Sequence, residues 1–168
     1  FSIYMNEELT SGSLLISKNA EPMPKVGFGS SIYLKKNKNI SFDFGIAHGV
    51  FHKNNFYTKR PFLHEKFAYV NIKKSNYKIG IGLVHEAMWA GGTPSLGDFP
   101  STLKDFLKVL ISADGPRAAS DPHANALGNH LGIWDFYFEK FNHEKKIKLY
   151  HQHLFEDSSG LRFANRYD

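Results

Sequence analysis

Long runs in which large apolar residues alternate with small or polar ones constrain this chain more than any other feature of its sequence. The clearest run covers residues 40–50, where the even positions are nearly all large and apolar and the odd positions are Ser, Asp, Gly, Ala and Gly. Successive side chains of a β-strand point to opposite faces, so a period of two predicts strands with one apolar and one polar or small-residue face. An antiparallel sheet with one solvated face and a membrane barrel both have this pattern.

Strand length favours the barrel. The runs are about 10 to 13 residues long, near the 9–11 that a tilted strand needs to cross a bilayer and longer than the 5–6 typical of soluble strands. We therefore predict an all-β fold: an antiparallel up-and-down transmembrane β-barrel of which residues 1–168 form part of a single outer-membrane domain, with a short helix in one long loop. Strands are expected near 1–7, 11–18, 25–36, 39–51, 62–74, 77–89, 130–141, 146–156 and 160–165.

The alternation also predicts which side chains share a face. Phe42, Phe44, Ile46, Val70, Ile72, Ile79 and Ile81 are expected to face lipid, whereas Asp43, Tyr69, Asn71, Glu86, Tyr150 and Gln152 are expected to face the barrel lumen.

The expected connections are mostly short at one end of the strands and longer at the other, as periplasmic turns and extracellular loops are. The longest, 90–129, is assigned to the extracellular end and is far beyond hairpin length. Within it, Ser101 is the expected N-cap of an amphipathic helix, which we expect to fold inward or over the barrel mouth. The expected apolar face of this helix carries Leu103, Phe106, Leu107, Leu110 and Ile111.

Composition excludes several classes of function. The chain has no cysteine, which removes disulfide frameworks and thiol catalysis, and no apolar run near the 18 residues of a membrane helix. The formal net charge is +5, but many lysines recur at expected strand ends and turns instead of forming one basic patch, so nucleic acid is not an expected partner. The first residues lack a leader pattern and the chain ends within an apparent strand, so we expect a piece of a longer protein.

Four compact motifs occur in order along the chain: LHEKFAY at 63–69, GLVHEAMWAGG at 82–92, NALGNHLG at 125–132 and LYHQHLFEDSSGLRF at 149–163. Together they resemble the Wzi capsule-assembly family, especially its Bacteroidetes members. The likeness covers nearly the whole chain and is strongest from about residue 60 to residue 165.

This resemblance implies a barrel of roughly eighteen strands, within the 8–26 usual for the class, of which this chain supplies about half. It implies an outer-membrane location in a Gram-negative bacterium and a non-enzymatic role in binding capsular or other surface polysaccharide and supporting its assembly or retention. Outer-membrane lipid and the capsule export machinery are the further expected partners, and no cofactor is expected. Two positions depart from the family pattern: Val84 precedes the His-Glu pair where an acidic residue is expected, and Phe67 replaces a tryptophan.

The expected polysaccharide site lies in and around the long loop. Aromatic rings suit the apolar faces of sugar rings, and amide or charged groups suit hydroxyls and carboxylates. The candidate binding residues are Trp89, Lys104, Asp105, Arg117, Asn125, Asn129 and His130. Asn125 and Asn129 also have a plainer explanation, because Asn and Gly satisfy turn geometry at a loop exit.

A second polar set is expected to brace the lumen wall: His64, Glu65, His85, Glu86, Tyr150 and Gln152. Neighbouring strands would also bring the two His-Glu pairs together, as general acid–base catalysis requires, so an outer-membrane hydrolase of lipid or glycan remains an alternative, with a porin as a third. No nucleophile elbow accompanies them, and no catalytic residue is assigned. His151 and His153 share a strand face, but this spacing is common by chance and no metal site is predicted.

Overall fold

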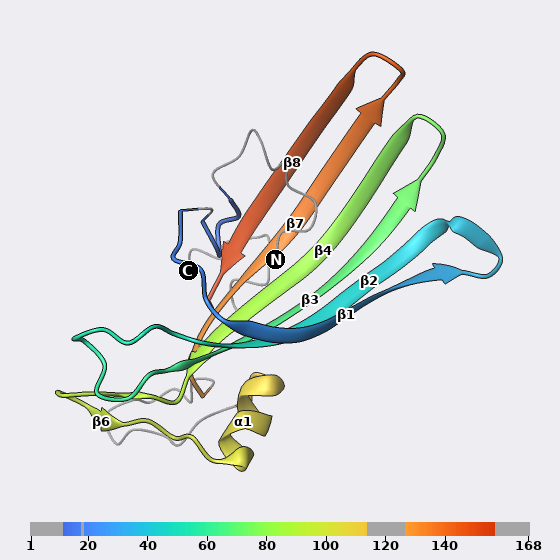
Figure 1. Cartoon of the computed structure of the whole chain (residues 1–168). Coiled ribbons are helices and arrows are strands. Elements are labelled where there is room, and N and C mark those ends of the chain that lie inside the picture. Colours follow the sequence, from blue (N-terminus) through green and yellow to red (C-terminus); the bar gives the residue numbers. More distant parts are fainter. Residues whose placement is uncertain (1–11, 18, 114–126, 157–168) are drawn as a thin grey trace, which may run out of the picture.

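Six long strands form one antiparallel meander. The structure is a computed structural model that describes residues 12–17, 19–113 and 127–156. Its strands are β1 (Lys25–Leu34), β2 (Asn37–Val50), β3 (Phe62–Lys73), β4 (Tyr77–Trp89), β7 (Asn129–Phe141) and β8 (Lys146–Phe155). They pair in the order β1-β2-β3-β4-β7-β8, so each is paired with the next long strand along the chain (Figure 1). This is the up-and-down all-β fold that the alternation predicts, and each strand begins and ends within two residues of its expected bounds.

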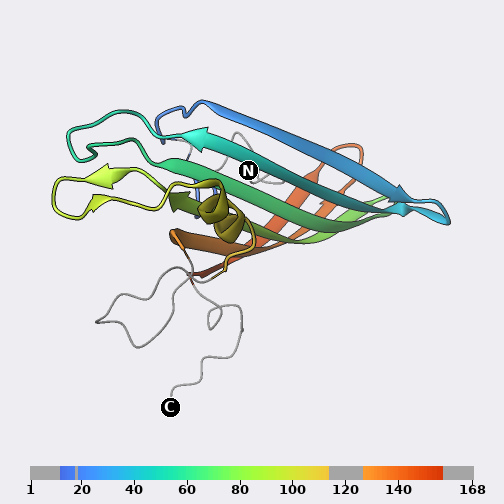
Figure 2. The same cartoon turned by 90° about the horizontal axis from the view of Figure 1, so that it is seen from below.

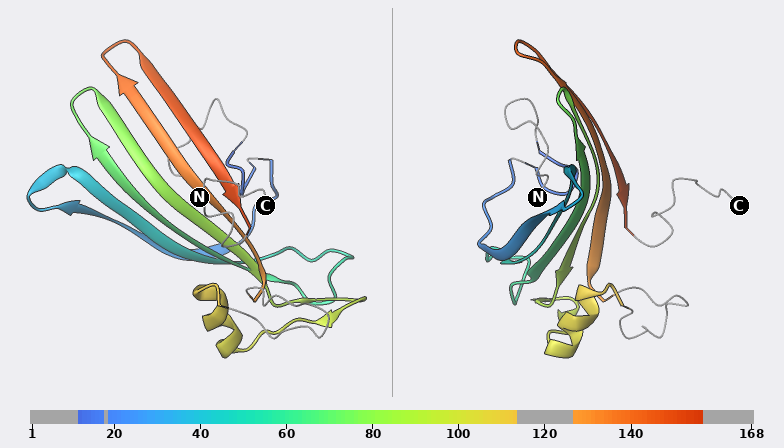
Figure 3. Two further views of the ribbon diagram at one scale, coloured as in Figure 1. Left: turned by 180° about the vertical axis from the view of Figure 1, so that it is seen from behind. Right: turned by 90° about the vertical axis from the view of Figure 1, so that its right-hand side faces the viewer.

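The strands form a single curved and twisted layer (Figure 3). Residues that are opposite each other across an antiparallel pair lie on the same face, so the register assigns every side chain to one of two faces. Asp43, Tyr69, Gly82, Asp135 and Gln152 are successive partners across the sheet and define what we call the polar face. The opposite, apolar face carries the row Ile32, Phe42, Val70, Ile81 and Phe136. The two groups expected on opposite faces are therefore on opposite faces. Of the helices described, none is long and apolar enough to span a membrane.

Large rings cover small residues on the polar face. The ring of Tyr69 lies over Gly82, and the ring of Tyr137 lies over Gly80. A Cβ atom built on either glycine would be 2.1 Å from the ring above it, so only glycine fits beneath them. Tyr69 forms a buried core with Val84 and Ile133. The small residues of the alternating pattern thus make room for side chains from neighbouring strands.

Residues 12–17, the described part of the strand expected at 11–18, do not form a strand. Residues 12–17 instead form a turn closed by an isolated bridge between Gly12 and Ser17. The turn lies against the polar face, because the Leu14 amide donates to Gln152 Oε1 at 3.0 Å and Leu15 packs on the Tyr69 core. A Ser-Gly-Ser sequence bends more readily than it extends, and the side-chain oxygen of Ser13 accepts from the amides of Leu15 and Ile16. The strands expected at 1–7 and 160–165 lie outside the described residues.

The long loop contains a small hairpin as well as a helix. Strands β5 (Gly92–Thr93) and β6 (Gly97–Asp98) pair with each other, and α1 (Leu103–Leu110) follows. The N-cap of α1 is Thr102 and not Ser101, because Thr102 and Asp105 form a reciprocal capping box. These hydrogen bonds hold the pKa of Asp105 below its ordinary value.

Helix α1 packs on the apolar face of the sheet, at the end that carries the long connections. Figure 2 shows α1 in front of the strands. Phe106 contacts the rings of His48, with centroids 5.1 Å apart, and Trp89, with centroids 5.4 Å apart. Val109 is fully buried against Ala87 and Leu127. Of the five residues expected on its apolar face, Leu103, Leu107 and Ile111 are exposed, because the sheet contacts the adjacent side of the helix.

Candidate functional site: an aromatic cavity at the loop end of the sheet

The end of the sheet that carries the long connections also holds an apolar cavity. Its volume is about 360 Å³, and it lies where the loop after β2, the loop after β4 and the start of β7 meet. The lining residues are Tyr57, Pro61, Met88, Trp89, Ala90, Phe99, Pro100, Leu127, Gly128 and Asn129. We call this the rim cavity.

A sharp bend at the end of β4 shapes the cavity. Ala90 and Gly91 are both left-handed, with φ of 55° and 81°, so the chain turns away as soon as the strand ends. A Cβ on Gly91 would be 2.8 Å from the Pro61 nitrogen, so a side chain there would push the two loops apart. The bend therefore depends on the glycine at position 91.

Backbone hydrogen bonds join the two loops beside the cavity. The Thr58 amide donates to the Gly92 carbonyl at 2.9 Å, and the Gly92 amide donates to the Lys59 carbonyl at 3.1 Å. The Phe99 amide donates to the Gly91 carbonyl at 2.9 Å, which places the ring at the cavity wall. An ion pair between Lys59 and Asp98 joins the same segments. The cavity is thus held by main-chain contacts and not by side-chain packing alone.

Three aromatic side chains and a methionine form much of the cavity lining. The Tyr57 hydroxyl donates to the Met88 sulfur at 3.6 Å, a weak bond that leaves the hydroxyl available to other partners. Trp89 packs between Phe62 and Phe106, each with its ring centroid 5.4 Å away. The indole Nε1 of Trp89 is buried and has no hydrogen-bond partner among the described residues. An apolar wall with a few polar groups at its edge is typical of small-molecule sites.

The structure brings together two of the seven candidate binding residues. Trp89 and Asn129 both line the rim cavity. His130 is next to Asn129 but points to the apolar face, where its Nε2 bonds the Leu127 carbonyl at 2.9 Å. Lys104 and Asp105 are on α1 and do not line the cavity, and Asp105 is engaged in the helix cap. Arg117 and Asn125 lie outside the described residues.

Two aromatic residues of the cavity were not predicted from the sequence. Tyr57 and Phe99 come from two different loops, which backbone hydrogen bonds of Gly92 to Thr58 and Lys59 hold side by side. The available signal was the presence of large aromatic residues within segments expected to be loops.

A hydrogen-bonded network crosses the polar face below the rim. The Tyr69 hydroxyl donates to Asp135 Oδ2 at 2.9 Å, and the Tyr137 hydroxyl donates to Asn71 Oδ1. The Asn71 amide in turn donates to Asp43 Oδ2 at 2.7 Å. These residues come from β2, β3 and β7, so the network links strands across the sheet and passes over β4.

The predicted lumen network divides between the two faces. Glu65, Glu86, Tyr150 and Gln152 lie on the polar face, where Glu65 accepts from Lys25 Nζ at 2.8 Å. His64 and His85 lie on the apolar face beneath α1, opposite the face that holds the two glutamates. Consecutive strand residues alternate between faces, and each histidine directly precedes its glutamate.

The same alternation separates the groups of the acid–base alternative. Strands β3 and β4 do pair, with Glu65 opposite Glu86, but the histidines are on the other side of the sheet. His64 stacks on His48 with ring centroids 5.0 Å apart, and His85 Nε2 lies 2.9 Å from His130 Nδ1. The two His-Glu pairs therefore do not converge on one point. No group of three metal-ligating side chains occurs among the described residues.

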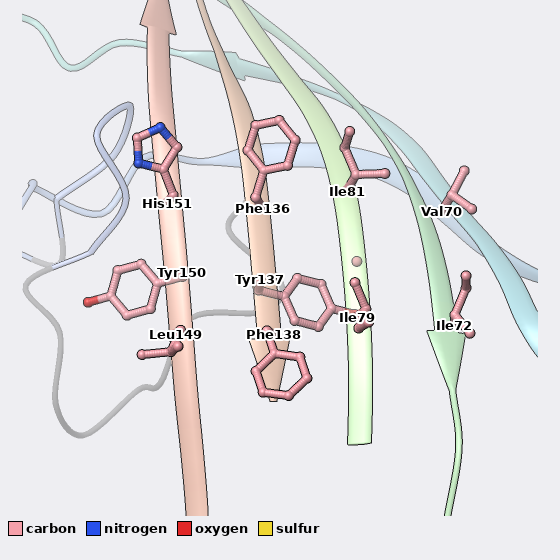
Figure 4. Close-up of a pocket in the computed structure, with 11 residues that line it drawn as sticks. Val70, Ile72, Ile79, Ile81, Phe136, Tyr137, Phe138, Leu149, Tyr150 and His151 are labelled. Carbon is pink, nitrogen blue, oxygen red and sulfur yellow. The ribbon is translucent and has the colours of Figure 1, made fainter. Parts of the chain in front are cut away.

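The apolar face has a broad groove of its own. Figure 4 shows its lining, which comes from β3, β4, β7 and β8 and includes Val70, Ile79, Ile81 and Phe136. Its side chains are largely aliphatic or aromatic, and several are about two-fifths exposed, including Ile79 and Ile81 at 43%. Such a surface suits acyl chains better than sugar hydroxyls.

Comparison with known proteins agrees with this architecture. A family model described as "Capsule assembly protein Wzi" matches residues 9–168. No curated protein and no solved structure matches the chain significantly. The family is described by its part in capsule assembly and not by a reaction. On this match, which covers nearly the whole sequence, the chain belongs to the capsule assembly protein Wzi family.

Proposed function

We propose that this chain forms part of the wall of an outer-membrane β-barrel and that its rim cavity binds surface polysaccharide during capsule assembly. The observation that carries the proposal is the position of the cavity. It lies at the end of the sheet with the long loops, which is the extracellular end of bacterial barrels.

The lining chemistry supports a sugar ligand. Tyr57, Trp89 and Phe99 present ring faces or edges, and the C–H faces of sugar rings are the apolar surfaces that such rings pack against. Asn129 adds an amide with two donors and an acceptor at the cavity edge. A volume of about 360 Å³ is within the 300–1,000 Å³ typical of ligand pockets. A cavity of this size takes a short part of a polymer and leaves the rest outside.

The two faces of the sheet support the membrane placement. Exposed Val70, Ile72, Ile79 and Ile81 form an apolar surface, and the opposite face holds the polar network around Asn71. A barrel wall between lipid and a polar interior has this arrangement, and all 168 residues then belong to one barrel domain. Lipid on one side and polysaccharide at the rim are the proposed partners, together with the capsule export machinery.

Alanine substitutions at the cavity test the sugar site. In the full-length protein, Tyr57→Ala, Phe99→Ala and Asn129→Ala should each weaken binding of the cell's own capsular polysaccharide. Loss of one ring contact of about 0.5–1.5 kcal/mol corresponds to a 2- to 12-fold rise in Kd. Co-sedimentation of purified protein with polymer measures this change, and retained capsule on cells should fall in parallel.

Leu96→Ala is the matched control, because Leu96 is 73% exposed in the β5–β6 turn and does not line the cavity. It should leave binding unchanged. Equal polymer binding by the three cavity variants and the control would contradict the proposal that the rim cavity binds polysaccharide. Release of cleaved polymer by the purified protein would favour the hydrolase instead.

A further inference from the structure

Four histidines and a lysine interrupt the apolar face at the rim end of the sheet. His48, His64, Lys66, His85 and His130 lie on neighbouring strands of that face, as the register shows. We call them the polar island. If this face meets lipid, as proposed above, the island lies where unshielded imidazole and ammonium groups are costly.

Helix α1 covers this island. Phe106 packs on the rings of His48 and His64, and Lys66 Nζ donates to the Leu110 carbonyl at 2.6 Å. That ammonium group also neutralises the negative end of the helix dipole. The polar groups of the face therefore occur where a helix shields them.

The covering helix exposes apolar side chains of its own. Leu103, Leu107 and Ile111 recur every four residues, and their exposed fractions are 74%, 52% and 73%. They form a stripe along one side of α1, while Phe106 and Val109 face the sheet. Lys104 and Lys108 lie on the adjoining side of the helix, which is the arrangement of an amphipathic helix at a lipid surface.

The height of the exposed apolar surface along β4 indicates why α1 must cover the polar island. On β4 the apolar residues that are not covered by other parts of the chain run only from Tyr77 to Leu83. At about 3.3 Å per residue and a strand tilt of about 40°, this segment spans roughly 15 Å of membrane. Barrels expose a belt about 25 Å tall. Continuing to Trp89, which packs against the rings of Phe62 and Phe106, gives about 30 Å by the same arithmetic and ends on aromatic rings.

Strand β1, at the edge of the described sheet, has exposed apolar residues up to this height. Val26 and Phe28 on β1 are 75% and 64% exposed. Val26 is opposite His48, in the same cross-strand row as His64. Exposed apolar side chains on β1 are therefore level with the covered island on β2 and β3.

We infer that α1 is a lipid-facing helix that completes the outer apolar belt of the barrel wall. Leu103, Leu107 and Ile111 contact acyl chains of the outer leaflet, and Lys104 and Lys108 pair with lipid phosphates. The inference rests on the proposed membrane placement of the sheet and is independent of the sugar site.

Quenching by labelled lipid tests it. The 168 residues contain no cysteine, so single labels are introduced by Leu103→Cys, Leu107→Cys, Ile81→Cys and Leu96→Cys in full-length protein, with any cysteine elsewhere replaced by serine. Each variant carries a nitrobenzoxadiazole label on its single cysteine. It is placed in vesicles of phosphatidylcholine and phosphatidylglycerol, mixed at about 3:1, that also contain a lipid with a doxyl-labelled acyl chain. Labels at 103 and 107 should lose at least about half of their emission, as the label at 81 should, and resist aqueous iodide. The label at 96 should respond to iodide alone.

The controls separate the two proposals. If the label at 81 is not quenched by the lipid, the membrane placement itself fails. If it is quenched but the labels at 103 and 107 respond to iodide, or to neither quencher, then water or protein covers the helix and the inference is overturned.

Discussion

On the polar face, the ring of Tyr69 packs closely over Gly82. Tyr69 is fully buried, and its ring occupies the space above Gly82 while its hydroxyl donates to Asp135. Because the ring is held at both ends, it cannot move aside without losing either its core contacts or its hydrogen bond. The glycine is thus required by close approach, although glycine is usually unfavourable inside a strand.

This contact predicts a large difference between two glycine substitutions. Gly82→Ala places a Cβ about 2.1 Å from the Tyr69 ring and should lower the free energy of unfolding by about 1–3 kcal/mol. Gly29→Ala, on the same face, meets nothing closer than 3.6 Å and should be neutral or slightly stabilising. Urea titration of the full-length protein in lipid vesicles measures both. Equal effects would mean that the ring does not lie over Gly82.

The face on which a strand side chain lies can be predicted from the sequence, but its partners from other loops cannot. Alternation predicts the faces of Asp43, Val70 and Ile81, because the period of two is a local property of the chain. The same rule places His64 and Glu65 on opposite faces, and grouping them as one network overlooked it. The partners of Tyr57 and Phe99 could not be predicted, because they depend on how two loops pack together.

At the scale of elements, the helix in the long loop shows the same limit. Its existence follows from local signals, and the Thr102–Asp105 capping box is readable from the sequence by the three-residue spacing. Which side is buried depends on the surface it meets. Val109 is buried and Leu103 is exposed because the sheet, with the rings of His48 and Trp89, contacts only one side of the helix.

The capping box gives a prediction for this element. Thr102→Ala removes the hydroxyl that accepts from the Asp105 amide at 3.3 Å and should destabilise α1 by about 1 kcal/mol. Hydrogen exchange of the α1 amides in the full-length protein should then be about fivefold faster, while exchange in β2 and β3 is unchanged. Thr102→Ser is the control and should behave like the parent. Unchanged α1 exchange in the alanine variant would show that the cap does not stabilise the helix.

At the scale of the whole molecule, the described sheet is open. Strands β1 and β8 are each paired on one side only within the described residues, so a closed barrel requires further strands. The order of the strands could be predicted from the short connections between alternating runs, such as Ser75–Asn76. The turn at residues 12–17 could not, because its place against the polar face depends on Gln152, a residue 138 positions from Leu14.

The central claim is that one face of this sheet meets lipid and the other faces a polar interior. Ser31 and Ile32 are consecutive on β1 and point to opposite faces at nearly the same depth. In lipid vesicles, Ile32→Arg should lower the free energy of unfolding by about 2–4 kcal/mol, because an arginine near the bilayer midplane is costly, whereas Ser31→Arg should change it by less than about 1 kcal/mol. Equal costs for the two substitutions, or a larger cost for Ser31→Arg, would contradict the membrane placement of the sheet.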